Sequence, residues 1–221
     1  MNKGKLIVIE GLDGSGKATQ TNLLTEKLKE KKFAVKKVSF PNYENPSSAL
    51  IKMYLNGELG KNPNDVNAYA ASSFYAVDRY VSYKKFWQTD YENGCCIIAD
   101  RYATSNAIYQ LSKIDEDKWD KFLEWIEFYE YRQLELPKPD LVIYLDVPIE
   151  VSQRLMTCRY DGDESKKDLH ESNLKFLSQC RQTALYSAHK LGWNIIKCSE
   201  NGQLRTVEDI HNDIINIVKK I

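Results

Sequence analysis

The chain has 221 residues, of which 43% are hydrophobic and 28% are charged, and its formal net charge at pH 7 is zero. A globular domain of this length buries about 70% of the surface of its unfolded chain, so we expect a single domain spanning residues 1–221. The zero net charge excludes the strongly basic balance that is typical of DNA- and RNA-binding proteins, and we therefore expect no nucleic-acid partner.

Cysteine content and hydropathy bear on the cellular compartment. The five cysteines are an odd number without metal-ligand spacing, which fits a reducing compartment. The apolar run after Lys5 is too short for a signal peptide, and no segment approaches the ~20 apolar residues of a membrane span. We expect a cytoplasmic protein without a membrane partner.

Short apolar runs and helical patterns alternate along the chain. The runs carry β-branched residues on both faces, as is typical of parallel strands covered on two sides. Between them apolar residues recur at helical spacing, and in the first helix we expect Leu23, Leu24 and Leu28 on the inner stripe. The predicted strands are 6–10, 35–40, 95–100, 141–147 and 194–198, and the predicted helices are 17–31, 66–87, 116–134 and 207–221.

This alternation predicts an α/β fold, a three-layer sandwich in which a five-stranded parallel sheet has helices on both faces. The polar stretch 159–168 contains Gly162 and charges of both signs, and it is the best candidate for a lid. Ligands in such folds bind at the carboxyl ends of the strands. That rule brings 11–17, Phe40-Pro41, Asp100-Arg101 and the segment after Asp146 to one rim.

A glycine-rich loop of P-loop type, GLDGSGK, follows the first predicted strand and opens the first helix. In this context backbone N–H groups and the helix N-terminus surround phosphate oxygens, while Lys17 reaches the outer phosphates. The motif usually continues with Ser or Thr, which touches Mg²⁺, but here Ala18 follows the lysine. The residues expected to bind a nucleoside triphosphate are Gly11, Leu12, Asp13, Gly14, Ser15, Gly16, Lys17, Ala18 and Thr19.

Two further segments carry residues suited to nucleotide chemistry. Asp100 ends a buried strand, where P-loop proteins place the carboxylate on the Mg²⁺ side, and Arg101 can hold a phosphate by two-point contact. The alternative for this pair is a strand-end ion pair. Tyr75 and Arg79 share one helix face, which suits a flat nucleobase, although aromatic residues at helical spacing more often pack in a core.

Together these motifs resemble those of thymidylate kinases of the bacterial type, within the nucleoside monophosphate kinases, and the resemblance runs nearly end to end. The Asp-Arg-Tyr segment and the Pro-Asp-Leu strand start are its more specific parts. It rests on residues 11–20, Phe40-Pro41, 75–79, Asp100-Arg101-Tyr102, Ser105-Asn106, Tyr109, 136–141 and 168–171.

The resemblance implies that ATP, with Mg²⁺, phosphorylates dTMP to dTDP for dTTP synthesis, and that the protein is a homodimer. The attacking phosphate oxygen is already ionised, so no strong general base is needed. It implies that Tyr75 stacks on thymine, that Arg79 hydrogen-bonds the base and that Tyr109 crowds the sugar C2′. The residues it implies for dTMP are Asp13, Phe40, Pro41, Tyr43, Tyr75, Arg79, Arg101, Ser105, Asn106 and Tyr109.

Members of this family supply a catalytic basic residue either from the P-loop or from the lid. The P-loop here has no arginine, so the resemblance implies a lid residue, and Arg159 is the first choice over Arg154, Lys166 and Lys167. The lid is expected at about 154–168, with Arg154 beside ATP. The implied catalytic residues are Lys17, Asp100, Arg101 and Arg159, with Asp100 acting on the metal indirectly.

Two alternatives remain open from the sequence. A deoxynucleoside kinase commonly has a Glu-Arg-Ser segment after the third strand, where this chain has Asp100-Arg101-Tyr102. A nucleotide-binding regulator that has lost catalysis is favoured only by Ala18.

Overall fold

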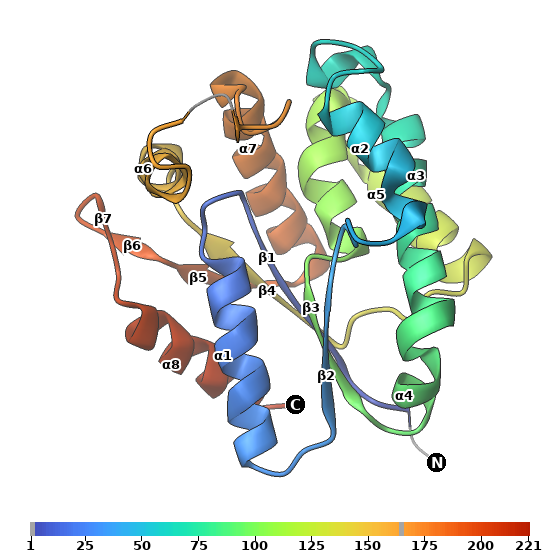
Figure 1. Ribbon diagram of the computed structural model, residues 1–221, viewed down its shortest axis with the longest axis vertical. Helices are drawn as coiled ribbons and strands as arrows, with labels where there is room; N and C mark the ends of the chain where they lie inside the picture. The colour runs from blue at the N-terminus through green and yellow to red at the C-terminus, as the bar shows by residue number, and fades with distance from the viewer. Residues whose placement is uncertain (1–2, 164–165) are drawn as a thin grey trace.

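The protein is described by a computed structural model, which covers residues 3–163 and 166–221. Five parallel strands form one sheet in the order β2-β3-β1-β4-β5 (Figure 1). This confirms the predicted sheet, and each observed strand lies within two residues of its predicted bounds. The strands are β1 (Leu6–Gly11), β2 (Val35–Ser39), β3 (Cys96–Asp100), β4 (Leu141–Asp146) and β5 (Asn194–Lys197).

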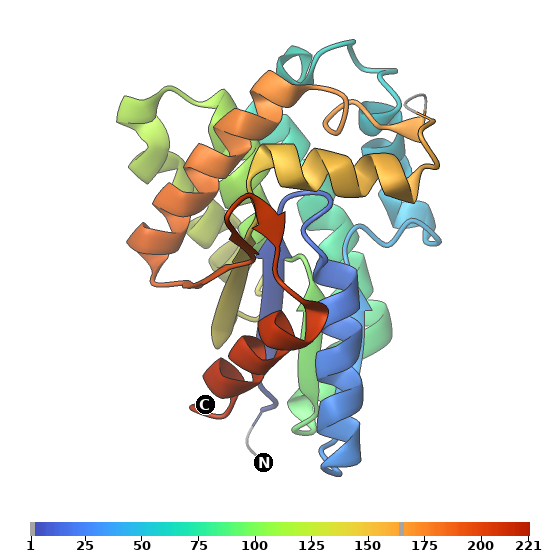
Figure 2. The same cartoon turned by 90° about the vertical axis from the view of Figure 1, so that its left-hand side faces the viewer.

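Helices cover both faces of the sheet (Figures 1 and 2). Alternate residues of β1 enter different cores: Leu6 and Val8 pack on one face, while Ile7 and Ile9 pack on the other. The first face is covered by α5 (Trp119–Ile126), α7 (Leu174–Leu191) and the end of the helical stretch that begins with α3 (Ala68–Ser82); the second is covered by α1 (Lys17–Glu30) and α8 (Val207–Val218). The arrangement is the three-layer sandwich of the P-loop NTPase fold.

Shorter elements complete the chain. The α-helices are α2 (Ala49–Leu55), α4 (Gln88–Glu92) and α6 (Ile149–Arg159), and a small antiparallel hairpin pairs β6 (Ser199–Glu200) with β7 (Gln203–Leu204). π-Helical turns span Tyr83–Trp87, Asn106–Gln110 and Glu127–Gln133. 3₁₀ turns span Pro46–Ser48, Pro63–Asp65, Ala103–Ser105, Leu111–Lys113 and Glu116–Lys118.

The inner face of α1 differs from the expectation. Leu24 is fully buried, but Leu23 is 38% exposed, so its predicted place on the inner stripe is wrong. The helix instead buries Thr21 and Thr25, whose hydroxyls donate to the carbonyl oxygens four residues earlier, at 2.7 and 2.8 Å. Because those hydroxyls are satisfied within the helix, threonine can occupy positions that an apolar pattern assigns to leucine.

Helices α6 and α7 were not predicted from the sequence. The inner face of α7 includes Thr183 and Ser187, whose hydroxyls donate to the carbonyl oxygens of Ile108 and Ala107 at 2.6 and 2.9 Å. These polar contacts weaken the apolar periodicity that predicts a helix. The first residues of the predicted lid, from Arg154, belong to α6. Within the described ranges, the structure contains no helix of the length and hydropathy that a bilayer crossing requires.

Candidate active site

The P-loop joins β1 to α1 at the carboxyl edge of the sheet, as predicted (Figure 1). Gly16 is the N-cap of α1 with φ 81°, a left-handed conformation that glycine adopts without strain. At Gly14, a Cβ would lie 2.6 Å from the backbone oxygen of Ser152 on α6, so only glycine allows this close approach. The loop therefore presents its backbone N–H groups and the start of α1 at one place.

Lys17 is 7% exposed and lies folded over the loop, where its Nζ donates to the carbonyl oxygen of Leu12 at 2.7 Å. Burial, together with the positive charge of Arg101, lowers the pKa of Lys17 to about 8. Asp13 and Asp100 oppose this shift, which places both carboxylates within electrostatic reach of the amine. The Lys17 amine thus lies against the P-loop, among the charged side chains of Asp13, Asp100 and Arg101.

Asp100 ends β3, and β3 pairs with β1 so that Asp100 lies opposite Ile9. It is 9% exposed and lies in the charge field of Lys17. Mg²⁺ in kinases is held by one or two carboxylates together with substrate phosphates and water. One carboxylate beside the P-loop lysine fits that donor set, and among the described residues no group of three or more His, Cys, Asp or Glu side chains could hold a metal ion.

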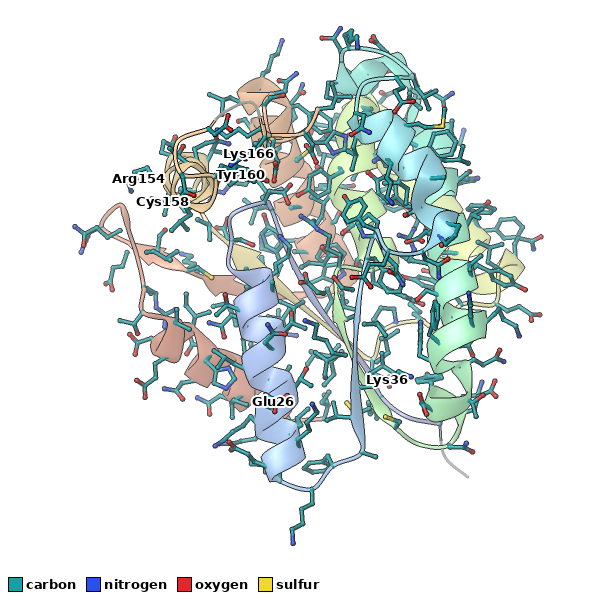
Figure 3. All side chains as sticks on the ribbon, viewed as in Figure 1. Glu26, Lys36, Arg154, Cys158, Tyr160 and Lys166 are labelled. Atoms are coloured by element: carbon teal, nitrogen blue, oxygen red, sulfur yellow. The ribbon has the colours of Figure 1, made fainter. Side chains whose placement is uncertain are left out.

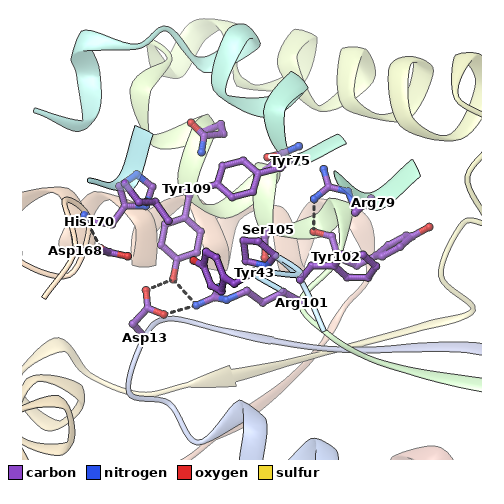
Figure 4. Close-up of a pocket in the computed structure, with 15 residues that line it drawn as sticks. Asp13, Tyr43, Tyr75, Arg79, Arg101, Tyr102, Ser105, Tyr109, Asp168 and His170 are labelled. Carbon is purple, nitrogen blue, oxygen red and sulfur yellow. Dashed lines mark hydrogen bonds and ion pairs between the residues drawn. The ribbon is translucent and has the colours of Figure 1, made fainter. Parts of the chain in front are cut away.

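Arg101 follows directly, in a left-handed conformation with φ 66°. Its guanidinium forms an ion pair with Asp13 and donates to the Tyr109 hydroxyl at 3.1 Å and to the carbonyl oxygen of Gly11 at 3.3 Å (Figure 4). The Tyr109 hydroxyl in turn donates to Asp13 at 2.9 Å. Although burial opposes ionisation, Arg101 and Lys17 hold the pKa of Asp13 well below its ordinary value.

A cleft lined by 15 residues opens beside this network (Figure 4). All ten residues that the sequence assigned to dTMP line it: Asp13, Phe40, Pro41, Tyr43, Tyr75, Arg79, Arg101, Ser105, Asn106 and Tyr109. They come from four places: the P-loop, the segment that follows β2, helix α3, and the segment that follows β3. The fold thus gathers residues separated by up to 96 positions, the separation between Asp13 and Tyr109, into one site.

The Phe40-Pro41 segment is tied to α3. Asp78 is 1% exposed and accepts hydrogen bonds from the backbone N–H of Asn42 at 2.9 Å and from the Ser47 hydroxyl at 2.6 Å. The peptide bond between Phe40 and Pro41 is cis. Through Asp78, the helix that carries Tyr75 and Arg79 also fixes the opposite wall of the cleft.

The cleft lining includes Tyr75, Arg79, Ser105 and Asn106. Arg79 is 1% exposed and forms a buried ion pair with Glu130. The Ser105 hydroxyl donates to both carboxylate oxygens of Glu10 at 2.9 Å, so it is already engaged. Glu10 is fully buried, and burial raises its pKa.

Five residues that line the cleft were not predicted as site residues, and Gln110, Asp168 and His170 carry polar groups among them; Leu55 and Tyr102 complete the set. Gln110 directly follows Tyr109, and both polar atoms of its amide are buried without a partner among the described residues. The His170 ring stacks on Tyr109 with centroids 5.6 Å apart. Asp168 and His170 belong to the motif at 168–171, so the resemblance itself was the signal that would have found them.

Three basic residues of the predicted lid, Arg154, Lys166 and Lys167, are not part of the cleft lining, and Nζ of Lys167 donates to the side-chain oxygen of Gln153 at 2.9 Å. Arg154 is exposed on α6, and its Nη2 donates to the carbonyl oxygen of Gly202 in the β6–β7 hairpin at 2.7 Å (Figure 3). Lys166 pairs with Asp163 at 3.7 Å. Arg159 ends α6, and its side chain falls outside the part of the chain that the structure describes.

Comparison with known proteins identifies relatives of this chain. A family model described as thymidylate kinase matches residues 9–214. A thymidylate kinase of Plasmodium falciparum is 32% identical over 219 residues, covering 99% of this chain and 91% of that protein. One of Mycobacterium tuberculosis is 30% identical over 189 residues, covering 82% of this chain and 84% of the other.

A solved structure of thymidylate kinase from Candida albicans has the same fold. It matches with a TM-score of 0.71 at 24% sequence identity, and the match covers 99% of this chain and 92% of that one. The sequence relationship extends over the P-loop, the cleft and the sheet together. The chain therefore belongs to the thymidylate kinase family.

Proposed function

We propose that this protein transfers the γ-phosphoryl group of ATP to dTMP, forming dTDP and ADP, within the cleft described above. Family membership supports the reaction. The observation that supports its location is the placing of Arg101 between the P-loop and the cleft, in contact with Gly11 and Tyr109. A group at that position can hold an acceptor phosphate beside the donor phosphates.

Binding of ATP falls to residues 11–19. The backbone N–H groups of the loop and the start of α1 surround the phosphates, and Lys17 leaves the Leu12 carbonyl to reach them. The residues present fit a Mg²⁺ ion, and Asp100 would be the carboxylate on the metal side of the phosphates. When bound, the ion neutralises charge on the phosphates of ATP.

Binding of dTMP falls to the cleft. Thymine lies against Tyr75, with Arg79 and Asn106 at its polar edge, and Gln110 supplies a further amide without a partner among the described residues. Phe40 and Pro41 form the opposite wall, and Tyr109 lies against the sugar. Arg101, with Tyr43, holds the acceptor phosphate against its repulsion by ATP.

Catalysis then consists of positioning and charge stabilisation, since the attacking oxygen is already ionised. We assign the final positive charge to the lid at about 154–168, with Arg159 as first choice and Arg154 on the ATP side. Closure of this segment would exclude water and limit ATP hydrolysis. The whole chain is proposed to act as one kinase domain.

Further proposals concern the state of the protein in the cell. All five cysteines are free thiols, which supports a reducing compartment such as the cytoplasm. We propose a homodimer, because α3 and the turns after α3 and α5 expose apolar side chains. These are Tyr69, Val77, Tyr80, Phe86 and Phe128.

Production of ADP from ATP and Mg²⁺ tests the proposed function when dTMP, dUMP, dCMP and thymidine are compared as acceptors. We expect fast turnover with dTMP and none with thymidine. Turnover with thymidine would instead indicate a nucleoside kinase, and ATP binding without turnover on any acceptor would indicate a regulator.

A further inference from the structure

Glu130 is a fully buried carboxylate in the π-helical turn that follows α5, and the proposed roles above do not use it. It contacts two residues of the cleft. Nε of Arg79 donates to Oε2 at 2.9 Å, and Nη2 of Arg79 donates to Oε1. Nδ2 of Asn106 also donates to Oε1, at 2.9 Å. One carboxylate therefore holds both polar side chains assigned to the edge of the base.

The first consequence concerns the orientation of the Asn106 amide. An ionised carboxylate accepts hydrogen bonds and cannot donate, so the NH₂ group of Asn106 must face Glu130. The same nitrogen lies 3.5 Å from the carbonyl oxygen of Ser72, a second acceptor. Oδ1 accepts no hydrogen bond from the described residues, and Asn106 lines the cleft. The group that Asn106 offers to a ligand is therefore an acceptor.

The second consequence concerns Arg79. An unpaired guanidinium that is 1% exposed would be strongly unfavourable, and Glu130 supplies its counter-charge. Burial alone would lower the pKa of Arg79, but the charge of Glu130 outweighs it and the pKa is raised. Nε and Nη2 donate to Glu130, while Nη1 donates to the carbonyl oxygen of Tyr102 at 3.5 Å (Figure 4). Arg79 lines the cleft, and Nη1 carries a second N–H that can donate to a ligand. Arg79 thus offers a fixed donor.

We propose that Glu130 is a positioning residue that sets the base selectivity of this enzyme by holding an acceptor on Asn106 beside a donor on Arg79. Thymine presents the matching edge, an N3–H donor beside the O4 acceptor, whereas cytosine presents an N3 acceptor beside an N4 amino donor. A cytosine base in the same pose would face like groups at both positions, and mismatched buried polar groups are the strongest source of such discrimination. This inference rests on the proposed function.

Replacement of Glu130 by Gln removes both constraints with little change in volume. The glutamine amide can donate as well as accept, so the Asn106 amide is free to turn, and Arg79 loses its counter-charge. Glu127 is the matched control, because it lies in the same turn but its side chain is only half-buried and pairs with Lys138 at 3.3 Å, away from Arg79 and Asn106.

The test compares kcat/KM for dTMP, dUMP and dCMP in the wild-type protein, Glu130→Gln and Glu127→Gln. Ratios between substrates do not depend on the fraction of folded enzyme. We expect the dTMP-to-dCMP ratio to fall about 10- to 100-fold in Glu130→Gln and to stay unchanged in Glu127→Gln. The dTMP-to-dUMP ratio should stay unchanged in both, because uracil presents the same edge as thymine; a merely structural defect has no reason to separate the two ratios.

An unchanged dTMP-to-dCMP ratio in Glu130→Gln, in an enzyme that prefers dTMP, would overturn the inference and leave the proposed function standing. A wild-type protein that does not phosphorylate dTMP would overturn both. If Glu130→Gln does not fold, Glu130→Asp replaces it: the shorter carboxylate cannot reach both partners at once, so the ratio should still fall, and an unchanged ratio would again contradict the proposal.

Discussion

The hydroxyl of Tyr109 donates a hydrogen bond to Oδ2 of Asp13 at 2.9 Å, joining the segment after β3 to the P-loop. Arg101 closes the triangle by contacting both residues. The P-loop thus holds the hydroxyl end of Tyr109, while the His170 ring stacks on the Tyr109 ring and the Arg101 guanidinium lies 5.0 Å from the Tyr109 ring centroid. A rigid ring edge at this position can exclude a sugar substituent, which a mobile ring could not.

Two substitutions of Tyr109 distinguish the contribution of its ring to sugar selectivity from that of its hydroxyl. In the proposed binding mode, Tyr109→Ala opens space at the sugar C2′, so we expect the preference for dUMP over UMP to fall about 10-fold or more. Tyr109→Phe keeps the ring edge and should keep the preference. Steady-state kinetics on the two nucleotides measures this; an equal loss in both variants would assign the discrimination to the contact with Asp13 instead.

Lys17 should act on the transferring group rather than on dTMP. Lys17→Met removes the positive charge from the donor phosphates, so kcat should fall by about 10²-fold or more, with little change in the Kd of dTMP. Lys29→Met, on the exposed face of the same helix, is the control. The assignment would be wrong if the two variants showed similar kcat values.

A substitution at Ala18 tests how the P-loop contributes to Mg²⁺ binding. Ala18→Ser adds the hydroxyl that most P-loops supply, so the Mg²⁺ concentration for half-maximal activity should fall, with kcat changing by less than about tenfold. A titration of activity with Mg²⁺ measures both quantities. An increase in kcat of several orders of magnitude would show that Ala18 disables the site.

The pH dependence of the free energy of unfolding should show the titration of the Asp168 carboxyl. Burial and the charge of Asp13 raise the pKa of this carboxyl from 3.8 to about 7. Within that window the folded protein binds a proton that the unfolded chain does not, so this group makes the free energy of unfolding fall as pH rises. Asp168→Asn removes the effect and can still accept the backbone N–H bonds of His170 and Glu171, at 2.8 and 2.9 Å.

The variant should therefore be more stable than the wild-type protein above pH ~7, and the difference should shrink as pH falls toward ~4. Urea unfolding at about pH 5 and about pH 8 provides the comparison. A difference of the same size at both pH values would mean that Asp168 does not titrate in this range.

Local sequence patterns predicted the sheet, the P-loop and Arg101, whereas most of the cleft residues were implied by the resemblance to thymidylate kinases. The buried strands are short β-branched runs, and Lys17 and Arg101 stand in motifs that follow such runs. The pairing of Arg79 with Glu130 joins residues 51 positions apart, and no local pattern reports it. Helix α7 was missed because its buried face contains hydroxyl groups whose partners lie in another element.

The most direct test of the account follows labelled γ-phosphate from ATP in the presence of dTMP and Mg²⁺. We predict that the label appears in the β-phosphate of dTDP, and that Arg101→Met slows its transfer by about 10²-fold or more, while the exposed-residue variant Arg132→Met keeps the wild-type rate. Label found only in inorganic phosphate, or transfer at the same rate in the wild-type protein and Arg101→Met, would contradict the proposed site.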